Sequence, residues 1–153
     1  MKFSAKTFAN FGKKPYNRGM NFKRKFYDEL LDWKNTYKGT NAMLIEGARR
    51  IGKSTIAETF AKNEYKDYIL LDFARESMDV KRLFTENLSD MESFFNNLFL
   101  LKQKELSPRE SVIILDEVQL FPQARQAVKY LVADGRFDYI ETGSLLSIKR
   151  KWK

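Results

Sequence analysis

The sequence predicts a three-layer α/β fold, in which helices cover both faces of a parallel β-sheet. Short apolar runs alternate with amphipathic stretches of helical length along the chain, which is the pattern of β-α-β units. A glycine-rich phosphate-loop motif stands between one such run and a helical stretch, and a later apolar run ends in two adjacent carboxylates. Both arrangements are typical of the carboxyl edge of a parallel sheet, where ligands bind.

The 153 residues fit one domain, which we expect at 26–148 between a basic N-terminal arm, 1–25, and a basic tail, 149–153. The arm holds eight Lys or Arg and no acid, and the tail holds four more. The net charge of +8 therefore belongs to the ends, and the body is mildly acidic. Basic ends can bind nucleic acid or acidic lipid, or they can simply be solvated.

The chain contains no Cys and no His. Disulfides, thiolate metal sites and imidazole catalysis are therefore excluded. No apolar run approaches the roughly 20 residues of a transmembrane helix. We expect a protein without a membrane span, located in the cytoplasm.

The first predicted elements lead up to the phosphate loop. Four large apolar residues recur at intervals of 4, 3 and 4, namely Phe26, Leu30, Trp33 and Tyr37. They predict an amphipathic helix that ends at Gly39. A buried strand at 42–46 follows, then a helix at about 53–63 and a second strand at 68–71. Asp72 ends that strand, and it either lines the site or caps the next segment.

The phosphate-loop motif G-x-x-x-x-G-K-[ST] comprises Gly47, Ala48, Arg49, Arg50, Ile51, Gly52, Lys53 and Ser54. In this pattern the backbone N–H groups wrap a phosphate, Lys53 neutralises the outer phosphates and the Ser54 hydroxyl is offered to Mg²⁺. The helix that follows adds its positive end, and Thr55 can add a hydroxyl near the inner phosphates. The motif predicts a site for a nucleoside triphosphate.

Two acids follow the apolar run 111–115, which has the composition of a central strand buried on both faces. At the carboxyl edge of the sheet, Asp116 can reach the Mg²⁺ that Ser54 also contacts. Glu117 is a candidate general base, or orients the water that attacks the γ-phosphate.

Two helices are predicted between the second strand and these acids. Apolar residues over 80–88 form one stripe, and the next helix begins at a capping box formed by Ser89 and Glu92. After the acids, a helix over 124–132 ends at Gly135.

The last predicted strand contains Asp138, Tyr139 and Ile140 and leads through Glu141 into Thr142, Gly143 and Ser144. We expect this strand to lie between the strand before the phosphate loop and the strand that carries the acids. Thr142 or Ser144 would then lie near the γ-phosphate, although Thr-Gly-Ser is also ordinary turn chemistry.

Three motifs together resemble the AAA-type ATPases, specifically a prokaryotic and archaeal group with a phosphate loop, hydrophobics-D-E-[VI]-Q and T-G-S. The matching segments are 47–54, 116–119 and 142–144. The resemblance covers about 26–148 and implies a P-loop NTPase core with an additional strand between the Walker A and Walker B strands. It also implies ATP with Mg²⁺, Glu117 as the catalytic carboxylate, and Thr142 or Ser144 as a polar sensor.

Members of that group continue beyond the sensor strand, whereas this chain stops. We therefore expect a fragment, or a short form, in which the C-terminal strand, the lid and the usual arginine finger are missing and activity is weak or lost. Arg125 and Arg136 are candidate fingers in trans, or are solvated.

ATP binding with Mg²⁺-dependent hydrolysis is the leading functional prediction. A nucleotide-dependent switch or interaction module with negligible turnover is the alternative, and a small-molecule P-loop kinase is the third. Predicted partners are the nucleotide, a second copy or another protein, and nucleic acid at the basic ends.

Overall fold

The computed structural model describes residues 4–7, 19–47 and 52–144, with side chains from residue 23 onward. Five strands form one parallel sheet in the order β1-β2-β5-β4-β3. Their bounds are β1 Ser4–Thr7, β2 Met43–Gly47, β3 Asp67–Asp72, β4 Ser111–Asp116 and β5 Asp138–Ser144. The predicted insertion of the last strand, β5, between β2 and β4 is confirmed.

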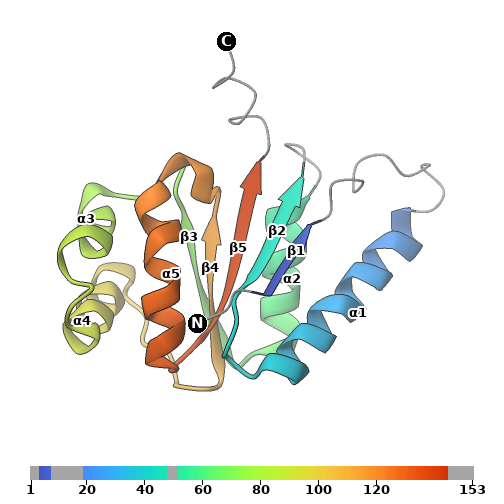
Figure 1. Cartoon of the computed structure of the whole chain (residues 1–153), viewed down its shortest axis with the longest axis horizontal. Helices are drawn as coiled ribbons and strands as arrows, with labels where there is room; N and C mark the ends of the chain where they lie inside the picture. Colours follow the sequence, from blue (N-terminus) through green and yellow to red (C-terminus); the bar gives the residue numbers. More distant parts are fainter. Residues whose placement is uncertain (1–3, 8–18, 48–51, 145–153) are drawn as a thin grey trace, which may run out of the picture.

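The helices form the two outer layers (Figure 1). Their bounds are α1 Gly19–Tyr37, α2 Lys53–Glu64, α3 Met78–Glu86, α4 Met91–Lys102 and α5 Pro122–Asp134, and a short 3₁₀ helix, η3, covers Val118–Leu120. One apolar cluster joins α1 and α2 to one face of the sheet. A second joins α3, α4 and α5 to the other face. The three-layer α/β prediction is confirmed.

The central strands β4 and β5 are covered on both faces, β4 with an apolar sequence and β5 with several buried polar residues. Every residue of β4 and β5 is buried, whereas β3 at the edge of the sheet is only partly covered. The apolar residues of α1 pack against the same cluster as α2, and Phe26, Leu30 and Trp33 are each at most 2% exposed. These contacts fix α2, and with it the residues that follow the phosphate loop.

Two local predictions differ from the structure. Residues 4–7 pair with β2 and α1 already begins at Gly19, so parts of the predicted basic arm belong to the sheet and to a helix. The cap of α4 is Asp90, whose side chain accepts a hydrogen bond from Ser93 N. The predicted capping box was wrong because Ser89 lies one residue too early, and Glu92 instead pairs with Arg136.

Within the described residues, none of the helices combines the length and the apolar composition that crossing a lipid bilayer requires.

Candidate nucleotide site

The predicted site residues that the structure describes lie near the carboxyl edge of the sheet, which is at the top of Figure 1. In the strand register, Gly47 at the end of β2 pairs with Ser144 at the end of β5. Asp116 at the end of β4 pairs with Asp72 at the end of β3. Residues far apart in the sequence therefore meet at one edge because parallel strands end together there.

The phosphate-loop motif runs into the first turn of α2, which contains its last two residues, Lys53 and Ser54. Gly52 caps the helix with φ +88°, a left-handed conformation that strains any residue with a Cβ. A Cβ at Gly52 would meet no atom within 4 Å, so this position requires glycine for its backbone and not for space. Ala48, Arg49, Arg50 and Ile51 lie outside the described residues.

Lys53 is buried although its side chain carries a charge. Its Nζ donates a hydrogen bond to the carbonyl oxygen of Gly47 across the loop, at 3.4 Å. A buried ammonium needs partners of this kind because desolvation of the charge is costly. Thr55, the next but one residue, is exposed at the start of the same helix.

Asp116 joins α2 to the centre of the sheet. The hydroxyls of Ser54 and Thr142 both donate to its Oδ1 atom, at 2.6 and 2.5 Å. Burial raises the pKa of the Asp116 carboxyl above its usual value, the two hydroxyl donors oppose this rise, and the nearby charges of Glu117 and Asp72 add to it. This edge of the sheet is thus rich in acids, and added positive charge would be stabilised there.

Asp72 holds the segment that follows its strand, one of the two roles considered for it, whereas the lining of the site stays a prediction. Its charge reaches Asp116, and its Oδ1 accepts a hydrogen bond from Ala74 N in the turn after β3, at 3.0 Å. The carboxylate therefore fixes the following turn while it adds negative potential to this edge.

Thr142 fixes the backbone between the two acids. Its side chain is fully buried, its hydroxyl donates to Asp116, and the same oxygen accepts a hydrogen bond from Glu117 N at 3.0 Å. These contacts support an indirect role for Thr142 through the acids. Its predicted role as a sensor of the γ-phosphate stays a prediction.

Replacing Thr142 with Val keeps the shape of the side chain but removes both hydrogen bonds. Because Glu117 N would then be left without its acceptor, we expect the free energy of unfolding to fall by about 1–2 kcal/mol. The measurement is urea denaturation beside Thr59→Val, a control on the exposed side of α2. Equal midpoints for the two variants would contradict the importance of this hydroxyl.

Glu117 adopts a left-handed backbone conformation, φ 59° and ψ 50°, where β4 turns into η3. Glu117 N is held by Thr142, and its carbonyl oxygen accepts a hydrogen bond from Leu120 N at 3.0 Å. The next residue, Val118, is fully buried. Non-glycine residues keep strained conformations where neighbouring contacts enforce them. Here the hydrogen bonds to Thr142 and Leu120 hold the backbone from which the Glu117 side chain extends.

Gln119 was not among the predicted site residues, although it belongs to the D-E-V-Q segment. Its Nε2 donates to Glu117 Oε1 at 2.5 Å, and its Oε1 accepts from Ser144 N at 3.1 Å. The side chain thus bridges the acid after β4 and the end of β5. The only signal for it in the sequence was its place in the motif.

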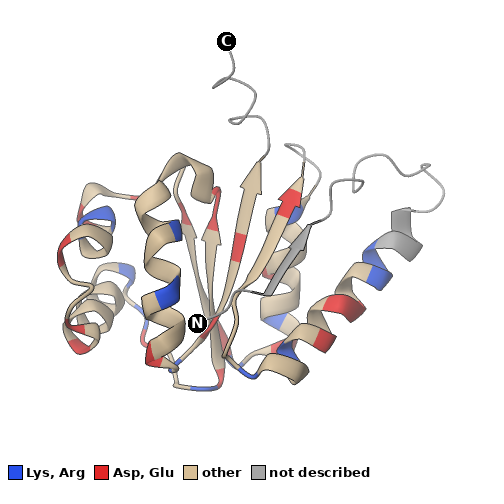
Figure 2. Ribbon diagram, viewed as in Figure 1, with Lys and Arg blue, Asp and Glu red and all other residues tan. Residues whose placement is uncertain are grey.

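A second unpredicted feature is Glu141, an acid inside the central strand β5 (Figure 2). It is 3% exposed, and its Oε1 is one of two buried side-chain atoms without a hydrogen-bond partner in the described part of the chain. Burial raises its pKa to about 7, Arg125 on α5 opposes the rise, and Glu46 on β2 adds to it. The order of apolar and polar residues in this strand did not distinguish a buried acid from an exposed one.

The two candidate arginine fingers have different surroundings. Arg136 lies before β5, pairs with Glu92 and Asp134, and stacks over the ring of Phe95. Arg125 lies on the exposed side of α5. The charge of Arg136 therefore already has partners within the protein, and its position needs no nucleotide to explain it.

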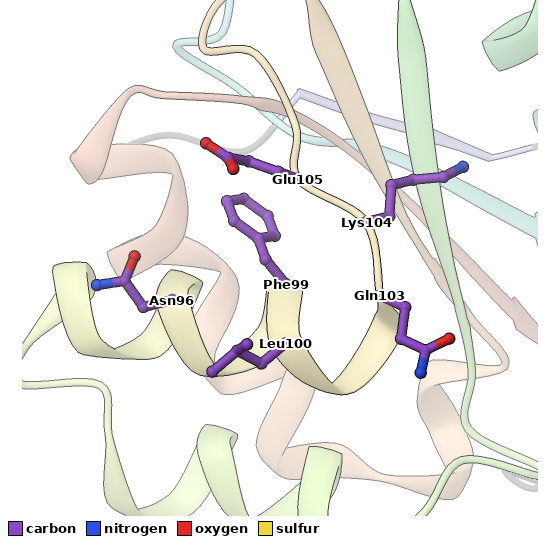
Figure 3. A pocket seen from close by; sticks show the side chains of 6 residues that line it. All are labelled: Asn96, Phe99, Leu100, Gln103, Lys104 and Glu105. Carbon is purple, nitrogen blue, oxygen red and sulfur yellow. The ribbon is translucent and has the colours of Figure 1, made fainter.

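Two hollows occur elsewhere on the described surface. One is lined by Asn96, Phe99, Leu100, Gln103, Lys104 and Glu105, around the end of α4 (Figure 3). The other lies along α1 and is lined by Glu29, Asp32, Trp33, Thr36 and Tyr37. Neither of these two hollows includes a predicted site residue.

Comparisons with known proteins agree with this geometry. A family model described as an AAA domain matches residues 39–152, a range that includes the phosphate loop, both acids and the end of β5. Neither the comparison with curated proteins nor the comparison with solved structures found a match. The family match spans most of the chain, and the chain belongs to the AAA domain family.

Proposed function

We propose that this chain binds ATP with Mg²⁺ and hydrolyses it to ADP and inorganic phosphate. The observation that carries the proposal is the hydrogen bond of 2.6 Å between Ser54 and Asp116. This bond connects Ser54, the last residue of the phosphate-loop motif, to Asp116 at the end of β4. In the sheet β4 is not adjacent to β2, the strand that leads into the motif. The family match supports the same function.

The donor atoms at this point suit magnesium. A hydroxyl oxygen and a carboxylate oxygen are hard ligands of the kind that Mg²⁺ prefers, together with water and phosphate oxygens. Ser54 and Asp116 would hold the ion, and Asp72 adds negative charge nearby. The bound ion supplies neutralisation of the negative charge on the β- and γ-phosphate oxygens.

The phosphates of the substrate would lie at the start of α2. The loop 47–52 would supply backbone N–H groups, and the helix adds the positive end of its dipole. Lys53 would exchange its hydrogen bond to the Gly47 carbonyl oxygen for the phosphate oxygens. Such an exchange keeps the buried ammonium paired in both states.

Glu117 is the proposed general base. A water oxygen would attack the γ-phosphorus while the bond from that phosphorus to the bridging β–γ oxygen breaks, and the water proton would pass to the Glu117 carboxylate. The electron pair of the broken bond stays on ADP, and the proton leaves with phosphate or solvent. Ser144, beside Gly47 in the register, is proposed to sense the γ-phosphate.

A switch with negligible turnover is the second candidate, and one contact favours it. In the structure the Glu117 carboxylate accepts a hydrogen bond from Gln119, which could keep it from a water molecule. Steady-state phosphate release at saturating ATP separates the two functions, because only the hydrolase releases phosphate continuously.

Replacing Lys53 with Ala tests the proposed nucleotide site. Loss of a buried ammonium that pairs with phosphate should weaken ATP binding by at least about tenfold. Calorimetric titration in Mg²⁺ measures it, with Lys62→Ala as a control on an exposed position of the same helix. Unchanged affinity for ATP in the Lys53 variant would argue against a phosphate site at α2.

A further inference from the structure

We infer that Gln119 is a positioning residue, which sets the Glu117 carboxylate by tying it to the end of β5. This inference rests on the proposed hydrolysis of ATP, because a general base needs a fixed orientation only if it acts on a water molecule. The evidence is a pair of hydrogen bonds that use both ends of one side-chain amide.

The chemistry of the partners fixes the orientation of that amide. Ser144 N can only donate, so it must face the amide oxygen of Gln119. A carboxylate without its proton can only accept, so Glu117 must face the amide nitrogen. The two requirements agree, and glutamine is the residue that meets both at this length.

The bridge is held from both sides. Gln119 belongs to η3, which is anchored by the fully buried Val118 and closed by the hydrogen bond from Phe121 N to the Val118 carbonyl oxygen, at 3.1 Å. Ser144 is 5% exposed and pairs in the sheet with Gly47. The side chain therefore connects the acid to the strand end beside the phosphate loop.

The consequence is a carboxylate with little rotational freedom. Thr142 fixes the backbone of Glu117, and Gln119 fixes one oxygen of its side chain. A displacement of about 1 Å in a reacting group can cost up to 10²-fold in rate. Removing the bridge should thus lower turnover while leaving the phosphate contacts of ATP in place.

The first test is Gln119→Glu. The new carboxylate can still accept from Ser144 N, but it cannot donate to Glu117 and it repels that side chain. We expect kcat to fall about tenfold or more, with an affinity for ATP within about twofold of the wild type. The control is Gln126→Glu, the same change at an exposed position of α5.

The second test exchanges the two residues in the double variant Glu117→Gln with Gln119→Glu. The amide at position 117 can then donate to the carboxylate at position 119, so the bond is restored in the reverse direction. We expect the urea midpoint to recover from its value in Gln119→Glu, whereas turnover should stay low because no carboxylate remains at position 117.

The outcomes separate this inference from the proposed function. If the wild type hydrolyses ATP and the Gln119→Glu variant turns over at the same rate or faster, only the positioning role is overturned. A double variant no more stable than Gln119→Glu would overturn the direct contact. Wild-type protein that binds ATP without releasing phosphate would overturn both the hydrolysis and the role of Gln119 in it.

Discussion

Replacing Glu117 with Gln is expected to lower steady-state ATP turnover by about 10²-fold or more, since general-base catalysis contributes about 10²–10⁴-fold. The amide has nearly the same shape, so the left-handed turn after β4 and its hydrogen bond from Glu117 N to Thr142 should persist. What is lost is the ability to take a proton from water. The measurement is phosphate release at saturating ATP and Mg²⁺.

The affinity for ATP decides how this loss is interpreted. Glu117 lies beyond the proposed ligands Ser54 and Asp116, so calorimetric titration of the variant should give nearly the wild-type affinity. Glu105→Gln, at an exposed position, controls for the change of charge. Equal phosphate release by the wild type and the Glu117 variant would refute the role of general base and leave binding without catalysis.

The elements around the site could be predicted because each has a strong local signal. The run 111–115 is apolar throughout, so a buried central strand was the simplest interpretation, and every residue of β4 is indeed buried. Gly135, with φ 85°, ends α5 as predicted. The position of β5 also followed from the sequence, because the motifs imply an additional strand between β2 and β4.

Other features depend on contacts that no local pattern records. The segment 4–7 is short and polar, and it is a strand only because β2 offers an edge to pair with. Ser89 and Glu92 match the sequence pattern of a capping box. The N-cap of α4 is nevertheless Asp90, because its carboxylate accepts the hydrogen bond from Ser93 N. Tertiary context decides such cases, since the alternatives differ by only about 1 kcal/mol.

The site shows the same division. The phosphate-loop motif and the predicted parallel sheet together suggested that Ser54 and Asp116 converge, because the start of a helix after one strand and the end of another strand share one edge of the sheet. The bridge through Gln119 could not be predicted in the same way, because it depends on the 3₁₀ turn of η3 and on the register that brings Ser144 beside it.

Glu141 provides the second large effect, a fall in stability as the pH rises. In the unfolded chain its carboxyl has the ordinary pKa of 4.5, whereas burial raises the pKa to about 7 in the folded protein. The folded state therefore holds this proton more tightly. The stability is fully present below pH 4.5 and is lost as the pH rises through about 7, by an amount on the order of 3 kcal/mol.

Replacing Glu141 with Gln should remove this dependence on pH, because the amide does not titrate. We expect the difference in unfolding free energy between the variant and the wild type to grow in favour of the variant from pH 4.5 to 7.5. Glu141→Met, which also removes the buried oxygen without a partner, should show the same trend.

Urea denaturation at several pH values measures this difference, which cancels the titration of other groups such as Asp116. Arg125→Met tests the cause from the opposite side, because Arg125 opposes the raised pKa and its loss should deepen the fall in stability. Glu105→Gln, an exposed change of the same type, should parallel the wild type. A constant difference between Glu141→Gln and the wild type across this range would mean that Glu141 stays charged in the folded protein, and that Arg125 outweighs the burial of the carboxyl.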